Sequence, residues 1–262
     1  MVDAGAAEPS PRVALVTGAS SGIGAATALA LADKGCKLAI GARRSERLDE
    51  VASQIQQRGG EVFARPLDVA DAASIDAFYD AAEDALGPID VVVNNAGICR
   101  PGLLHETRDG DLEAEVAVNL LAPMLLARRA IRRMLADKRP GDLVFISSEN
   151  AVLPRTFQLG YTATKMGVEG VARVLRMELE GTGIRSTIVR PGPTGTEFGQ
   201  GWDPGLIARL LESWKYWGVQ RHFQMLPAES VAAAVVTVVF APPGTHLDVV
   251  QVMPEGPPAG VP

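Results

Sequence analysis

Tyr161 and Lys165 are the residues whose types and spacing point most directly to proton transfer. They are four positions apart, so on a helix their side chains lie on neighbouring turns of one face. A free tyrosine has a pKa of about 10 and is a poor base at neutral pH, but a nearby ammonium favours the phenolate. Tyr161 is therefore a candidate acid/base whose pKa Lys165 is expected to lower. Taken alone, Tyr161 is more simply interpreted as a partly buried aromatic near the start of a helix.

A glycine-rich turn lies near the beginning of the sequence. The run TGASSGIG, residues 17–24, joins an apolar strand-like segment to the helical pattern AATALALADKG. Its glycines allow a tight turn and a close approach to the backbone, and the start of the following helix favours a phosphate. The spacing G-x3-G-x-G differs from the general G-x-G-x-x-G fingerprint of dinucleotide-binding turns. Because a strand-to-helix turn often uses glycine for geometry alone, this turn needs support from elsewhere in the chain.

The elements that must position these residues alternate regularly. From Arg12 onward, apolar segments of strand length alternate with longer helical patterns, which is typical of βαβ units and a parallel sheet. Several segments are nearly continuous in Val, Ile and Leu, as expected where helices cover both faces. We predict an α/β fold, a single doubly wound Rossmann domain over residues 12–253, with a flexible tail at 1–11 and a C-terminal tail at 254–262. The seven predicted strands span residues 12–17, 37–42, 61–67, 89–95, 142–148, 184–190 and 247–253.

Composition limits the classes of function. The chain has 262 residues, 47% hydrophobic and 21% charged, which is ordinary for a globular protein. A net charge of −6 argues against a general nucleic-acid binder. The most apolar segment, residues 230–241, is too short for a membrane span, and no secretory signal is recognised. Two cysteines without metal-ligand spacing and only three histidines predict a cytoplasmic protein with reduced thiols and no metal site.

One segment, residues 193–226, departs from the alternation. An insertion of this length in a compact domain is usually a lid or a binding loop. It contains all three tryptophans of the chain. An amphipathic helix that uses its aromatics as core is the simpler interpretation, but their concentration predicts a lid over an apolar substrate. The expected lid residues are Phe198, Trp202, Trp214 and Trp217.

Three motifs together resemble the short-chain dehydrogenase/reductase family: TGASSGIG, NNAG at residues 94–97 and YTATK at residues 161–165. The resemblance covers residues 12–253 and is weak in the lid. T-G-x3-G-x-G is the spacing of the compact branch of the family, whereas the extended branch uses T-G-x-x-G-x-x-G. The resemblance implies hydride transfer between a nicotinamide cofactor and a substrate carbon, with the protein supplying orientation.

The resemblance implies further catalytic residues. Family members carry a serine thirteen residues before the tyrosine, which is Ser148, and it is expected to donate a hydrogen bond to the substrate oxygen. Asn119, in AVNLLAP, is expected to hold a water that connects Lys165 to solvent. Lys165 is also expected to hold the nicotinamide ribose, and the positive charge of an oxidised nicotinamide adds to its effect on Tyr161.

The resemblance also places residues around the cofactor. Asp68 is expected against the adenine amino group, and Asn94 lines the site or braces the sheet. Thr194 departs from the family pattern, which usually has Val or Ile there. The residues expected to bind the cofactor are Gly18, Ser20, Ser21, Gly22, Ile23, Gly24, Arg43, Arg44, Asp68, Val69, Asn95, Ala96, Gly97, Tyr161, Lys165, Pro191, Gly192, Thr194 and Thr196.

Arg43 and Arg44 follow Ala42, where a dinucleotide-binding fold often carries an acid that accepts hydrogen bonds from the ribose 2′-hydroxyl. The guanidinium fork instead suits a 2′-phosphate. Ser45 is expected to cap the next helix, so both cations lie at the positive end of its dipole, and an anion between them would remove that conflict. The pair predicts NADP(H), with Arg43 as the stronger candidate and Arg44 stacked on adenine or facing solvent. Solvated loop charges are the simpler alternative.

These observations favour an NADP-dependent oxidoreductase acting on a secondary alcohol or ketone. The lid favours an apolar substrate, such as a terpenoid, steroid or aromatic alcohol. A same-fold epimerase or dehydratase and a non-catalytic sensor that binds NADP(H) are the alternatives. Two long predicted helices, residues 112–138 and 161–180, are expected to form a homodimer or homotetramer interface, although packing within one chain explains the same residues.

Overall fold

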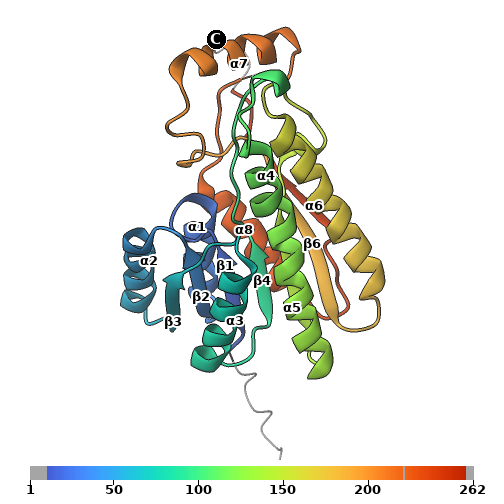
Figure 1. Ribbon diagram of the computed structural model, residues 1–262. Helices are drawn as coiled ribbons and strands as arrows, with labels where there is room; N and C mark the ends of the chain where they lie inside the picture. Colours follow the sequence, from blue (N-terminus) through green and yellow to red (C-terminus); the bar gives the residue numbers. More distant parts are fainter. Residues whose placement is uncertain (1–10, 221, 258–262) are drawn as a thin grey trace, which may run out of the picture.

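Seven parallel strands form one sheet at the centre of the structure, a computed structural model that describes residues 11–220 and 222–257 (Figure 1). The strand order is β3-β2-β1-β4-β5-β6-β7, the order of a doubly wound Rossmann fold with one further strand. The predicted tails lie mostly outside the described residues, at 1–10 and 258–262. The strands are β1 (Val13–Thr17), β2 (Lys37–Ala42), β3 (Val62–Pro66), β4 (Val91–Asn94), β5 (Gly141–Ile146), β6 (Ile184–Pro191) and β7 (Val249–Val252).

The central strands divide their side chains between two cores. On β1, Val13 and Leu15 belong to one buried cluster, and Ala14 and Val16 belong to the other. Because successive side chains of a strand point to opposite faces, a strand covered on both sides must be apolar at every position. The continuous apolar runs of the sequence therefore reflect burial on both faces of the sheet.

Helices cover both faces. The cluster that contains Leu15 includes residues of α3, α5 and α6, and the cluster that contains Val16 includes residues of α1, α2 and α8. Helix α7 lies apart from both layers, beyond one end of the sheet (Figure 1). The helices are α1 (Gly22–Ala32), α2 (Ser45–Gln57), α3 (Ala72–Leu86), α4 (Asp111–Val116), α5 (Ala122–Ala136), α6 (Leu159–Glu178), α7 (Pro204–Tyr216) and α8 (Ala228–Val239).

Two local expectations need correction. Ser45 does not cap α2, because the helix begins at Ser45 itself and Arg44 takes the capping position with an extended backbone. The long helix predicted at 112–138 is not uniformly α-helical, since a π-helical turn at Ala117–Leu121 joins α4 to α5. Such turns are frequent at functional sites, and this one contains Asn119.

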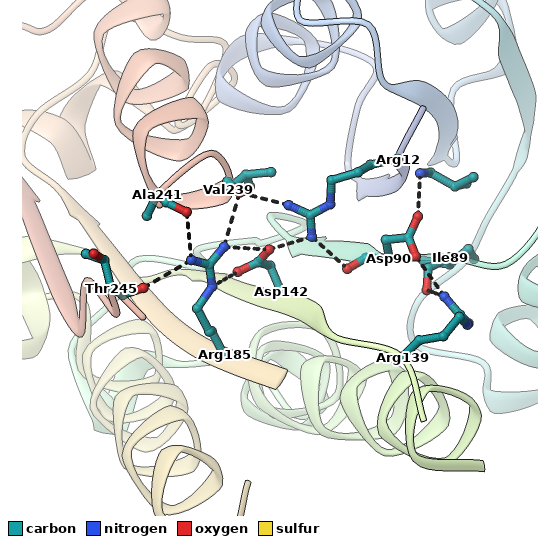
Figure 2. Close-up of polar contacts among 10 residues, drawn as sticks. Arg12, Ile89, Asp90, Arg139, Asp142, Arg185, Val239, Ala241 and Thr245 are labelled. Carbon is teal, nitrogen blue, oxygen red and sulfur yellow. Dashed lines mark hydrogen bonds and ion pairs between the residues drawn. The ribbon is translucent and has the colours of Figure 1, made fainter. Parts of the chain in front are cut away.

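An ionic network closes the amino edge of the sheet (Figure 2). The Asp142 side chain, only 2% exposed, accepts hydrogen bonds from Arg12 at 2.5 Å and from Arg185 at 2.7 and 3.0 Å. Asp90 accepts from Arg139 at 2.7 Å and from the Val13 backbone N–H at 2.9 Å. Together these residues connect the amino ends of β1, β4, β5 and β6.

Arg12 and Arg185 also bind the end of α8 and the residues that follow it. Arg12 donates to the Val239 carbonyl at 2.8 Å, and Arg185 donates to the carbonyls of Val239, Ala241 and Thr245 (Figure 2). The last carbonyls of a helix have no partner within it, so cations there are favourable. The network therefore holds the end of α8 against the sheet.

Candidate active site

A cavity of about 1140 Å³ lies at the carboxyl ends of the strands. Open α/β sheets bind their ligands in the crevice at this edge. Every residue that the sequence predicted to bind the cofactor lines the cavity, as does Ser148. A cavity of this size exceeds that of a typical pocket for one small ligand, so it has room for a dinucleotide and a substrate together.

The glycine-rich turn is held tightly against the end of β4. Gly18 has a φ of +66°, a conformation that favours glycine. Asn95 donates to the Thr17 carbonyl at 2.8 Å, and its backbone N–H donates to the Thr17 hydroxyl at 3.1 Å. A Cβ at Gly24 would lie 2.4 Å from the Gly18 carbonyl oxygen, closer than any real contact. The glycines thus allow the turn to fold onto the start of α1, with Asn95 as its brace.

The start of α1 faces the cavity without an acidic or capping side chain. Its first turn contains no acid, and the hydroxyl of the capping residue Ser21 makes no capping bond. Instead, Arg44 donates to the hydroxyls of Ser21 at 2.7 Å and Ser20 at 3.1 Å. Free N–H groups at a helix start, next to a guanidinium and two hydroxyls, form a site suited to phosphate.

The two arginines after β2 differ in their surroundings. Arg44 contacts the glycine-rich turn, whereas Arg43 is exposed and makes no side-chain hydrogen bond or ion pair with the described residues. The sequence placed Arg43 ahead of Arg44 as a phosphate ligand and left Arg44 stacked or solvated. In the structure, Arg44 is the arginine that is hydrogen-bonded to the turn.

The catalytic candidates lie together beyond β5. Tyr161 and Lys165 occupy successive turns of α6, and the Lys165 Nζ lies 5.6 Å from the centre of the Tyr161 ring. Lys165 donates to the Ile146 carbonyl at 2.8 Å. Ser148 follows the same strand, and its Oγ accepts from the Asn150 backbone N–H at 3.2 Å. Strand end and helix therefore present all three side chains to one region of the cavity.

Burial shifts the pKa values of Tyr161 and Lys165. It raises the pKa of Tyr161 well above its ordinary value, and a hydrogen bond with Ser148 acts in the opposite direction. Burial also lowers the pKa of Lys165 to about 8. In the chain alone, desolvation outweighs the other contributions to the Tyr161 pKa. The expected lowering of that pKa by Lys165 and an oxidised nicotinamide stays a prediction.

Asn119 lies behind the cavity wall. Its amide exchanges hydrogen bonds with the Ile98 backbone, both at 2.8 Å, and donates to Thr164 at 3.2 Å. A Cβ at Gly97 would lie 3.5 Å from the Asn119 Oδ1 and 3.6 Å from the Lys165 Nζ. Gly97 therefore leaves an opening between Asn119 and Lys165, although Asn119 does not line the cavity itself.

The segment at residues 193–226 is closed at its base and covers the cavity. Leu226 donates from its backbone to Pro193 at 2.8 Å and accepts from Gly195 at 2.9 Å. Phe198 lies against Tyr161, with ring centres 5.4 Å apart, and Trp202 lies against Phe198. Trp214, on α7, donates to the Thr156 carbonyl at 2.9 Å. The segment thus reaches the reactive tyrosine from one side and the loop before α6 from the other.

The family model of short chain dehydrogenases matches residues 12–206. The chain belongs to the short-chain dehydrogenase family. It is 37% identical to 2,3-dihydro-2,3-dihydroxybenzoate dehydrogenase of Bacillus subtilis, over 71% of each chain. It is 38% identical to D-threitol dehydrogenase of Mycolicibacterium smegmatis, over 73% of this chain and 74% of that one. A metagenomic short-chain oxidoreductase solved with NADP superposes with a TM-score of 0.77 at 31% identity, over 93% and 97% of the two chains. This short-chain dehydrogenase is therefore an oxidoreductase.

Trp217 needs correction as a lid residue of this short-chain dehydrogenase. It is 65% exposed, packs edge-on against Tyr216 and does not line the cavity. Trp217 follows Tyr216, the last residue of α7, and the chain turns away at Gly218, which has a φ of +68°. Phe198, Trp202 and Trp214 do line the cavity.

A buried polar network beside the aromatic lid was missed in the sequence, and its Arg155 lies 5.1 Å from the centre of the Trp214 ring. Arg155 donates to Glu149 and to Asn150, both at 2.6 Å, and Asn150 donates to Gln158 at 2.7 Å. All four side chains are buried and line the cavity. In the sequence these four residues lie between Ser148 and Tyr161. Their position between two recognised candidates is the sequence signal that could have identified them.

The described residues contain neither a candidate membrane span nor a candidate metal site. No helix among them is long and apolar enough to cross a membrane. No three His, Cys, Asp or Glu residues in that part of the chain gather so that they could hold a metal ion.

Proposed function

We propose that this short-chain dehydrogenase transfers a hydride between NADP(H) and a secondary alcohol or ketone, with Tyr161 as the acid/base. The observation that carries the proposal is one cavity bounded by the glycine-rich turn, the Arg44 cluster and the Ser148, Tyr161 and Lys165 group. The nucleotide site and the proton-transfer site therefore lie in one cavity. A reaction that moves both a hydride and a proton to or from one substrate requires this arrangement.

The residues at the adenosine end fit NADP(H). The start of α1 would hold the pyrophosphate, and Arg44, Ser20 and Ser21 would hold the 2′-phosphate together with Arg43. Ala42 ends β2 where an acid would repel that phosphate. The metagenomic relative solved with NADP supports the same cofactor.

The residues around Tyr161 fit proton transfer to or from a substrate oxygen. When bound, the nicotinamide supplies or accepts the hydride. The Tyr161 phenol is protonated at neutral pH, so it carries the proton that a carbonyl oxygen needs during reduction. Ser148 donates a hydrogen bond to that oxygen, and Lys165 holds the nicotinamide ribose. Asn119, through the opening at Gly97, positions a water beside Lys165.

The residues that line the cavity fit an amphipathic substrate. Phe198, Trp202 and Trp214 give one wall an aromatic surface suited to an apolar body. Glu149 and Arg155, which packs on Trp214, add buried polar groups to the cavity lining near Ser148. We therefore refine the apolar substrate expected from the sequence to an apolar alcohol or ketone with a further polar group close to the reacting carbon.

An apolar surface on α4, α5 and α6 supports a homodimer or homotetramer. Large side chains on these helices and the π-helical turn between them are exposed in the single chain, where burial against a second copy would be favourable. They are Val116, Leu121, Met124, Met166, Val174 and Met177. Sedimentation at micromolar concentration measures the assembly, and a monomer would contradict it.

Cofactor oxidation in the presence of a panel of ketones tests the proposal. We expect NADPH to be consumed in preference to NADH. The double variant Ala42→Asp with Arg43→Ser restores the acid and removes one cation, so it should shift that preference toward NADH. An unchanged preference would contradict the assignment of the 2′-phosphate site. Cofactor binding without turnover of any ketone would favour a non-catalytic sensor instead.

A further inference from the structure

Glu197, in the lid, forms ion pairs with two arginines at the start of α2. Its carboxylate accepts from Arg44 at 2.7 Å and also pairs with Arg47. These contacts join segments 150 or more positions apart in the chain. The Glu197 side chain is 29% exposed and lines the cavity. No sequence motif singles out Glu197, because it follows Thr196 in a segment where the family resemblance is weak.

Arg44 is shared between the glycine-rich turn and the lid. Its Nη2 donates to Ser20 and Ser21, while its Nη1 donates to Glu197. The base of the lid also packs on the turn, since a Cβ at Gly22 would lie 3.0 Å from the Thr196 side chain. The carboxylate of Glu197 therefore lies where an anion bound by Arg44 and the turn would also have to lie.

We propose that Glu197 is a specificity-determining residue for the cofactor, competing with the 2′-phosphate of NADP(H) for Arg44. This inference rests on the proposed function. A phosphate that approaches Arg44 meets a carboxylate of like charge, so the Arg44–Glu197 pair must open before the phosphate gains the guanidinium. NAD(H), which lacks this phosphate, binds without opening the pair.

The charges around Glu197 explain why the competition persists at neutral pH. Its hydrogen bond from Arg44, followed by the charges of Arg44 and Arg47, holds the pKa of Glu197 below its ordinary value, so the side chain stays ionised. Ala42 leaves the end of β2 without the acid that other dinucleotide folds carry. In this chain a carboxylate reaches the adenosine end from the lid, so cofactor preference and lid position depend on the same ion pair.

Titration calorimetry with adenosine 2′,5′-bisphosphate and with 5′-AMP tests this inference without turnover. Both probes carry the 5′-phosphate, and only the first carries the 2′-phosphate. Glu197→Gln removes the competing charge and should tighten binding of the bisphosphate by about tenfold, while binding of 5′-AMP changes by less than about twofold. Glu197→Ala should act in the same direction.

Glu50→Gln is the matched control. Glu50 also pairs with Arg47, at 3.5 Å, but it lies on α2 and does not line the cavity. Its replacement removes one negative charge near Arg47 and should leave the affinities of both probes unchanged. A wild-type preference for the bisphosphate that Glu197→Gln does not increase would overturn the inference alone. Equal wild-type affinities for both probes would overturn the proposed NADP(H) preference, and the inference with it.

Discussion

The two edges of the central sheet use arginine in opposite ways. At the amino edge, Arg12 and Arg185 are paired with the buried Asp142 and with backbone carbonyls (Figure 2). At the carboxyl edge, Arg43 contacts no described acid, and Arg44 is paired with a carboxylate from the lid. Arg12 and Arg185 thus have fixed partners at the amino edge, whereas Arg43 and Arg44 border the cavity at the carboxyl edge.

The direction of the strands accounts for this difference. In a parallel sheet the helices that follow the strands begin at the carboxyl edge, so their positive ends and free N–H groups gather around the cavity. The amino edge receives the last carbonyls of α8, which the arginines satisfy. We therefore expect substitutions at the carboxyl edge to change chemistry and binding, and substitutions at the amino edge to change stability.

Replacement of Tyr161 by phenylalanine should give the largest effect. It removes the acid/base hydroxyl and keeps the ring that packs on Phe198. We expect kcat for ketone reduction to fall by about a thousandfold, equivalent to about 4 kcal/mol. The affinity for NADPH and the unfolding midpoint should change little. Steady-state kinetics and calorimetry measure these quantities, and retained turnover would remove Tyr161 from its role.

Replacement of Asp142 by asparagine tests the amino edge. It leaves Arg12 and Arg185 without their buried counter-charge, so the free energy of unfolding should fall by about 3 kcal/mol. Turnover per folded molecule should not change. Asp76→Asn is the control, because Asp76 pairs with Arg129 at an exposed site, where such a pair contributes less than about 1 kcal/mol. Equal losses in the two variants, measured by denaturant unfolding, would contradict the difference drawn between buried and exposed pairs.

The fold was predictable because its signals are local and repeated. The predicted strand at 37–42 agrees with β2, and the strand at 184–190 differs from β6 by one residue. Asp71 caps α3 by accepting from the Ala73 N–H at 2.9 Å. Strands that are covered by helices on both faces, and helices with capping residues, have patterns that can be recognised within a few residues of sequence.

Much of the site depends on contacts that no short motif records. The Glu197 pairs join the lid to α2, and the Arg155 network lines a wall between two recognised candidates. The desolvation that acts on Tyr161 is likewise recorded in no motif. A four-residue spacing places Lys165 on the adjacent turn, but the burial that raises the tyrosine pKa is a property of the folded cavity.

Lys165 carries a charge at the carboxyl edge at the expense of stability. Burial lowers its pKa to about 8, against about 10.5 when unfolded, so between these values the unfolded state binds more protons and stability rises with pH. Lys165→Met removes this titration. We expect the unfolding free energy of the wild type, relative to that of the variant, to rise by about 2 kcal/mol from pH 8 to pH 10. Because both proteins contain the same thiols and tyrosines, the difference between their pH profiles reports the titration of Lys165. Parallel profiles would show that Lys165 is not desolvated.

The two tryptophans at the end of α7 allow a matched comparison within the carboxyl edge. Trp214 lines the cavity, donates to Thr156 and stacks with Arg155, whereas Trp217 is 65% exposed outside it. Trp214→Leu should raise KM for an apolar ketone by about tenfold and leave KM for NADPH unchanged, because it removes aromatic surface only from the substrate wall.

Trp217→Leu should change both constants by less than about twofold. If it instead raised the ketone KM as much as Trp214→Leu, the lid would act through its own folding and not through contact with substrate. A Trp214→Leu enzyme with an altered KM for NADPH would place the tryptophan's effect at the cofactor. Only a loss confined to Trp214 and to the ketone assigns the aromatic wall to substrate binding.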